Sequence, residues 1–280
     1  MSRVRALPNR VDAGVGGVLL PALGAMVLVL PLGSLLLGVD WAGLPRTLAQ
    51  RPVVQALRLS LWTSAVATLL CLVLGIPLAW WLADSATRGP LRRRVAGFVR
   101  TCVTLPLVLP PTVAGVALLT AFGRKGVVGH LLYQWSGLAL PFTSVAVVLS
   151  QAFVAMPFLV VSLEGALAQR DQALEEAAWT MGADEWRTVR HVVLPMALPA
   201  LAAGTVLCWA RALGEFGATI TFAGNLPGVT QTLPLAVYLA MQDDPAQARA
   251  MSVVLLVVAG VVIAGMRGRW VGGLGRIAGR

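Results

Sequence analysis

The stretch Glu175–Pro195, EEAAWTMGADEWRTVRHVVLP, is polar and charged, whereas the chain around it is strongly apolar. The 280 residues are 58% hydrophobic and only 12% charged, and the mean hydropathy is +0.80. An ordinary soluble domain has about half of its residues apolar, so this chain exceeds that composition. The stretch is therefore expected to be a water-facing loop between segments that lie in lipid.

The stretch itself predicts two short helices joined by a glycine turn. Asp171 is a suitable N-cap for the first helix and Asp184 for the second, because a short acidic side chain accepts from free backbone N–H groups. Gly182 lies between them and can adopt the left-handed conformation that ends a helix. The second helix is expected to end near His191, before Pro195.

Six apolar segments surround the stretch, and each is expected to be a transmembrane helix. The first five have 21 to 27 residues, enough to cross a hydrocarbon core of about 30 Å. The sixth has 16 residues, flanked by Arg249 and Arg267, whose long side chains can reach the membrane surface. Transmembrane β-strands would be shorter and alternating. The fold class expected is an all-α membrane protein with one domain over residues 1–280. Its six expected spans are residues 15–37, 57–83, 102–122, 145–167, 198–222 and 251–266, and its polar loop is residues 168–197.

The basic residues predict the orientation of these spans. With the N-terminus in the cytoplasm, the cytoplasmic segments carry fifteen Arg residues and the outer segments carry five basic residues. Because Lys and Arg collect in cytoplasmic loops, both termini and the polar loop are expected inside. The net charge of +10 is thus explained by membrane topology, and nucleic acid is not an expected partner.

The spacing within the loop is similar to the EAA motif of binding-protein-dependent ABC importer permeases. That motif reads E-A-A, three residues, G, nine residues, I-x-L-P; here Glu176 begins it, Gly182 is its glycine, and Val192 replaces the Ile. The resemblance implies a type I importer permease fold and a loop that couples to a cytoplasmic ABC ATPase. The residues to which it gives this coupling role are Glu175, Glu176, Ala177, Ala178, Gly182, Leu194 and Pro195.

The chain has no nucleotide-binding P-loop of its own. Such a loop needs Gly-Lys-Ser/Thr, and the single lysine, Lys125, stands between Arg124 and Gly126. The resemblance accordingly implies two separate ATPase subunits, and the chain itself is not expected to be an enzyme. No cofactor is expected, and no metal site, because His130 and His191 are isolated.

Residues 210–238, ARALGEFGATITFAGNLPGVTQTLPLAVY, bring ionisable and polar side chains to membrane depth. Arg211 and Glu215 are four residues apart and are expected to pair on one helix face. Two roles fit this pair: a structural ion pair that fixes helix packing, or a charge on which an anion steps. The candidate translocation path comprises Arg211, Glu215, Thr219, Asn225, Thr230, Gln231 and Thr232.

This run resembles the molybdate permease subunits, in which R-A-L-G-E-F-G-A-T precedes A-G-N, a P-G turn and T-Q-T-L-P-L-A. Sulfate and thiosulfate permeases diverge after the turn and are the alternative within this class. The segment Leu105–Gly115, LPLVLPPTVAG, also resembles the family, and its prolines free carbonyls that must face protein or a water-filled path. The resemblance implies an importer of molybdate, with tungstate as an alternative substrate, in a prokaryotic inner membrane, a homodimer of this chain, and an extracytoplasmic molybdate-binding protein.

An ion-coupled secondary transporter and an intramembrane enzyme are the competing classes. A secondary transporter often shows internal repeats; none is visible here, and the loop motif would have no explanation. An intramembrane enzyme needs paired catalytic groups at depth, where Arg211 and Glu215 are the candidates, and an arginine keeps its proton. The cysteines have neither paired nor ligand spacing.

Overall fold

The structure is a computed structural model that describes residues 15–85 and 88–277. Within these residues it consists of helices, turns and loops, which confirms the all-α fold class. The basic residues counted before position 15, and Arg280, lie outside the described residues. By length and composition, five described helices could cross a membrane: Leu19–Leu37, Arg51–Asp84, Ser144–Ala168, Glu185–Leu213 and Pro245–Val262.

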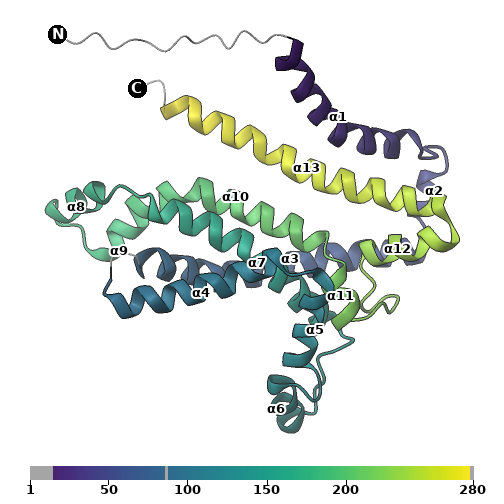
Figure 1. Ribbon diagram of the computed structural model, residues 1–280, viewed down its shortest axis with the longest axis horizontal. Coiled ribbons are helices and arrows are strands. Elements are labelled where there is room, and N and C mark those ends of the chain that lie inside the picture. Colours follow the sequence, from purple (N-terminus) through teal and green to yellow (C-terminus); the bar gives the residue numbers. More distant parts are fainter. Residues whose placement is uncertain (1–14, 86–87, 278–280) are drawn as a thin grey trace.

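The centre of the fold is a bundle of α3 (Arg51–Asp84), α7 (Ser144–Ala168) and α10 (Leu194–Leu213), with α7 packed against both of the others (Figure 1). Small residues let these helices approach closely. A Cβ on Gly75 of α3 would lie 3.2 Å from the Leu159 side chain, and one on Gly204 of α10 would lie 3.0 Å from Cβ of Ser162. α7 is thus the helix on which the other two are placed.

The third expected span, residues 102–122, is not one helix, and that prediction is wrong. The chain forms α4 (Pro90–Val108) and α5 (Pro111–Phe122), with Leu109 and Pro110 extended at ψ 134° and 133°. A residue that precedes a proline is driven out of the helical region, and two successive prolines do this twice. α5 then leads into α6 (Val127–Ser136), and both project from the bundle (Figure 1).

The fifth expected span, residues 198–222, is also divided, so its prediction as one helix is wrong. α10 ends at Leu213 and α11 (Gly217–Phe222) follows after a three-residue break. The break begins at Gly214, the C-cap of α10, and α11 packs against α5 and α7. Both divided segments therefore meet in one region of the fold.

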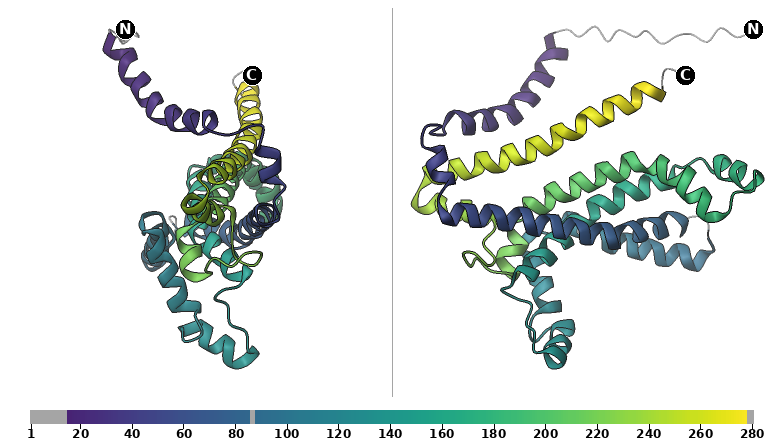
Figure 2. Two further views of the ribbon diagram at one scale, coloured as in Figure 1. Left: turned by 90° about the vertical axis from the view of Figure 1, so that its right-hand side faces the viewer. Right: turned by 180° about the vertical axis from the view of Figure 1, so that it is seen from behind.

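The remaining long helices lie at the chain ends. α1 (Val15–Leu37) coincides with the first expected span, whereas α13 (Pro245–Ile277) is far longer than residues 251–266. Three further helices were not predicted, α2 (Leu44–Leu48), α6 and α12 (Leu233–Asp243), because they are too short for a hydropathy signal. α1 and α13 diverge from the bundle (Figures 1 and 2).

The polar loop lies at one end of the bundle. Its helices α8 (Gln172–Thr180) and α9 (Glu185–Thr188) occupy the same end as the last turn of α3 and the first turn of α4. At the opposite end lie α2 and the junction of α12 with α13 (Figure 2). This arrangement places the expected cytoplasmic connections together.

Candidate functional site

The polar loop has the predicted order of helix, glycine turn and helix. The Asp171 side chain accepts from the N–H of Ala173 at 3.0 Å, and that of Asp184 accepts from the N–H of Arg187 at 2.7 Å. Gly182 between the two helices has φ +82°. The two caps and the turn are local chemistry, which is why the sequence predicts them.

The second loop helix does not end near His191, and that prediction is wrong. One turn of π-helix, Val189–Val193, joins α9 to α10 without a break, and the N–H of Leu194 donates to the carbonyl of Val189. A proline cannot donate to the helix, and a π-turn is a local way to accommodate such a disturbance; here it lies directly before Pro195. Residues 185–213 thus form one continuous rod from the loop into the bundle.

The loop residues of the motif divide into two groups. Glu176 and Ala177 are exposed, whereas Ala178 is buried. Glu175 is turned inward, and its Oε1 lies 2.6 Å from Nε of Arg170. The Arg170 guanidinium lies 5.8 Å from the centroid of the Trp80 ring of α3, a cation–π contact. Glu175 therefore ties α8 to the bundle, whereas Glu176 and Ala177 face outward. Gly182, Leu194 and Pro195 are also exposed.

The loop also exposes large apolar side chains, which the sequence reading missed. Met181 is 81% exposed and Trp186 70%, and Trp179 and Leu174 are exposed as well. We call these four residues the apolar loop surface. Leu174, Trp179 and Met181 precede the helix Glu185–Leu213 that could cross a membrane, whereas Trp186 lies in its first turn. Large apolar side chains that are exposed outside such a helix are typical of an interface. The tryptophans and the methionine inside a polar loop are the sequence signal that could have predicted this exposed surface.

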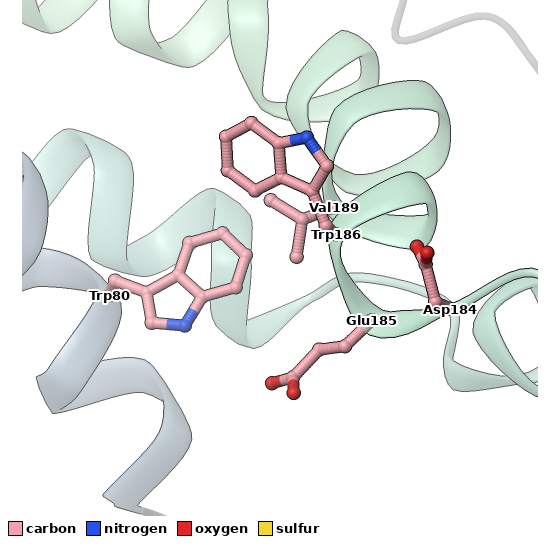
Figure 3. Close-up of a pocket in the computed structure, with 5 residues that line it drawn as sticks. All are labelled: Trp80, Asp184, Glu185, Trp186 and Val189. Atoms are coloured by element: carbon pink, nitrogen blue, oxygen red, sulfur yellow. The ribbon is translucent and has the colours of Figure 1, made fainter.

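A cavity of about 510 Å³ lies between α3 and the second loop helix. Figure 3 shows Trp80 on one side of it and Trp186 and Val189 on the other, with the Glu185 side chain extended toward the Trp80 side and Asp184 turned away. Asp184 is held by its capping bond. The loop is thus attached through α8 while a gap separates α9 from α3.

Arg211 and Glu215 do pair, but they do not share one helix as predicted. Arg211 is in the last turn of α10, and Glu215 lies in the break that follows. Their side chains approach to 2.6 Å, with Glu215 1% and Arg211 28% exposed. The second carboxylate oxygen of Glu215 accepts from the N–H of Ala218 at 2.8 Å. The carboxylate therefore joins the end of α10 to the first turn of α11.

The other residues of the candidate path lie close by in the chain and are mostly buried. Thr230 accepts from the N–H of Leu226 at 2.9 Å, inside a loop whose glycines Gly224 and Gly228 have φ of +73° and +74°. Asn225 is half-buried. The buried members of the set are Thr219, Thr230, Gln231 and Thr232.

The segment Leu105–Gly115 meets this region through two glycines. A Cβ on Gly115 of α5 would lie 2.5 Å from Cβ of Thr221, and one on Gly217 would lie 2.5 Å from Cβ of Pro111. No side chain fits in either place. The two stretches of sequence that suggested a substrate path are thus brought together by close contact of α5 with α11.

The sequence profile described as "Binding-protein-dependent transport system inner membrane component" matches residues 75–271, a range that includes the loop and the α10–α11 break. Among similar proteins are two molybdenum transport system permease proteins ModB. The protein from Mycobacterium bovis is 45% identical over 90% of this chain and 93% of its own length. The protein from Escherichia coli K12 is 39% identical over 80% of this chain and 96% of its own length.

Solved structures of bacterial importers share the fold. A chain of an ABC transporter involved in the import of alginate has a TM-score of 0.68 and 18% identity, covering 91% of this chain and 94% of that one. A chain of the MetNI methionine ABC transporter has a TM-score of 0.59 and 20% identity, covering 78% and 96%. The fold, the loop and the matched profile agree, and the chain belongs to the binding-protein-dependent transport system inner membrane component family.

Proposed function

We propose that this chain is the membrane permease of an ATP-driven importer of molybdate. The observation that carries the proposal is its similarity, over most of both chains, to permeases named for molybdenum transport. The run of residues 210–238 supports it, because the ion pair of that run lies where the transmembrane helix is interrupted and its polar turn follows α11. Irregular backbone at membrane depth is tolerated where it is buried in protein or lines a path.

The family fixes the kinds of partner. As an inner membrane component of a binding-protein-dependent system, the chain works with a separate ATPase and a periplasmic binding protein. Our proposal adds the finer assembly: two copies of this chain, two ATPase subunits and a binding protein that delivers molybdate. It also places both termini and the loop in the cytoplasm, since the basic residues favour that orientation.

In this assembly the loop docks on the ATPase through its exposed residues. Glu176 and Ala177 and the apolar loop surface are available for contact, while Glu175 holds α8 to the bundle through Arg170. The rod of residues 185–213 then carries a movement of the loop to the α10–α11 break. A mobile linker could not transmit such a movement.

Docking is tested with the double substitution of Trp179→Ser and Met181→Ser. We expect the ATPase subunit retained by the purified permease to fall about tenfold, which corresponds to a loss of about 1.4 kcal/mol. Trp135→Ser is the matched control, because Trp135 is 90% exposed on α6, far from the loop. Equal retention by the loop variant and the control would contradict docking through this surface.

Transport is tested in proteoliposomes that contain the permease, its ATPase and its binding protein. We expect ATP-dependent uptake of labelled molybdate that tungstate and unlabelled molybdate reduce and that excess sulfate leaves unchanged. Uptake of sulfate in preference to molybdate would replace the proposed substrate. Uptake that proceeds without the ATPase would overturn the proposed class of transporter.

A further inference from the structure

We propose that Gln151, with Thr219, provides uncharged hydrogen-bond donors for a tetrahedral oxyanion at the α10–α11 break. The inference rests on the proposed function, and it assigns to the site a residue of α7 that the sequence analysis did not select. Residues three or four apart share a helix face. Val147 and Val154 pack in one cluster with α11. Val148 and Ala155 pack in another with the end of α10. Gln151 lies between these pairs, and therefore opposite the break.

The amide of Gln151 is buried without a partner. The side chain is 0% exposed, and neither Nε2 nor Oε1 has a hydrogen bond. Its neighbour Ser150 is equally buried, but its hydroxyl donates to the carbonyl of Ala146 at 2.9 Å. Burying an amide without a partner carries its full desolvation cost. Packing alone would be served better by an apolar residue, so the amide needs another explanation.

The buried polar atoms without a hydrogen bond belong to few parts of the chain. In the part of the chain that the structure describes, every buried side-chain nitrogen or oxygen that lacks a hydrogen bond belongs to Gln151 or to residues 215–232. Thr219 of α11 is among them, 0% exposed and with a free Oγ1. α11 packs directly against α7. Gln151 and Thr219 therefore lie on two helices that contact each other, and each has a buried polar group without a hydrogen bond.

The chemistry of the cluster fits an oxyanion. A deprotonated tetrahedral oxyanion offers only acceptors, and the Gln151 amide and the Thr219 hydroxyl can both donate. The cation at the end of α10, Arg211, is paired with Glu215 at 2.6 Å. Uncharged donors beside a neutralised pair hold an anion weakly, which suits a passage from which the anion must also leave.

The test uses two shape-conserving substitutions, Gln151→Met and Thr219→Val, in the complete importer. Each removes a donor that has no partner, so we expect an unchanged or higher melting temperature in detergent and unchanged binding of the ATPase. Molybdate uptake should fall at least about tenfold in each variant. Thr63→Val is the matched control: Thr63 is also 0% exposed, but its hydroxyl donates to Leu59 at 2.8 Å, and its uptake should stay normal.

Two results would overturn the assignment. Normal uptake by both variants would show that neither donor serves transport. A lower melting temperature with a parallel loss of ATPase binding would show a purely structural role. If the wild type prefers sulfate, the proposed substrate fails, and the same variants measured with sulfate still decide the role of Gln151.

Discussion

At Gly182 the cost of a side chain comes from the backbone alone. Its φ is +82°, and a Cβ at this position would meet no atom within 4 Å. A β-branched residue is strained in this region by about 1–3 kcal/mol, whereas asparagine tolerates it. We expect Gly182→Val to reach the membrane normally but to separate ATP hydrolysis from uptake, and Gly182→Asn to transport almost normally. Equal uptake by the two variants, measured at equal abundance, would contradict a role for this turn.

Glu215 has two partners, so its loss is more serious than that of Arg211. Glu215→Ala leaves the guanidinium and the N–H of Ala218 unpaired, and breaking a buried pair costs about 3–5 kcal/mol. Glu215→Gln retains an acceptor for Ala218 and should cost less. Thermal unfolding in detergent shows whether Glu215→Ala lowers the melting temperature more than Glu215→Gln does. A purely electrostatic role for Glu215 would give equal losses, because both variants remove the charge.

Combining Arg211→Ala with Glu215→Gln separates the two roles of the pair. Neither charge is then left alone, so abundance in the membrane should recover. If the anion steps on Arg211, the double variant does not import molybdate. Wild-type uptake by a well-expressed double variant would leave only the structural role.

The contact of α5 with α11 is an element-scale feature with a clear steric test. Gly115→Ala and Gly217→Ala each place a Cβ about 2.5 Å from a neighbouring Cβ. Overpacking of this kind costs about 1–3 kcal/mol. We expect both variants to unfold at lower temperature, whereas Gly165→Ala in α7, which meets nothing within 4 Å, should be neutral or stabilising. Equal melting temperatures for the three would show that the contact relaxes freely.

The helices were predicted where the signal is local or long. Asp171, Gly182 and Asp184 act on atoms within three residues, and α1 coincides with a long, continuous apolar segment. The two prolines that follow Leu109 indicate the break there, because a residue before a proline avoids the helical conformation. A hydropathy average does not register this, since it depends only on composition. A mean over many residues cannot show where a helix bends.

The second break has no such local signal. Gly214 ends α10, yet glycines also occur inside helices, and Gly217 is required by Pro111, a residue far away in the chain. The position of Gln151 opposite the break likewise depends on tertiary packing. The loop caps could thus be predicted, whereas the arrangement of the candidate path needed the structure.

At the scale of the whole molecule, the proposed orientation is tested by cysteine labelling. The background variant is Cys102→Ala, because Cys102 is exposed while Cys71 and Cys208 are buried. Ser136→Cys, at the end of α6, should react with an impermeant reagent from outside. Gly89→Cys, between α3 and α4, should react only after the membrane is opened. The reverse pattern would invert the topology.

The rod of residues 185–213 has the mechanics of a lever with unequal arms. It packs tightly against α7 at Gly204, where a Cβ would lie 3.0 Å from Cβ of Ser162, and the Ser162 hydroxyl donates to the carbonyl of Ala200 at 3.1 Å. About 28 Å of helix separates this fulcrum from Glu185, and about 14 Å separates it from Leu213. If the rod pivots there, its end at the break moves half as far as its end in the loop and in the opposite direction. The force at the break is then twice the force applied at the loop. Spin labels at Arg187 and Gly214 should then move oppositely relative to α7 during ATP turnover, the first about twice as far; motion in the same direction would exclude the pivot. A small movement at the break, driven by a larger movement of the loop, suits a gate that must separate tightly packed helices by a small distance.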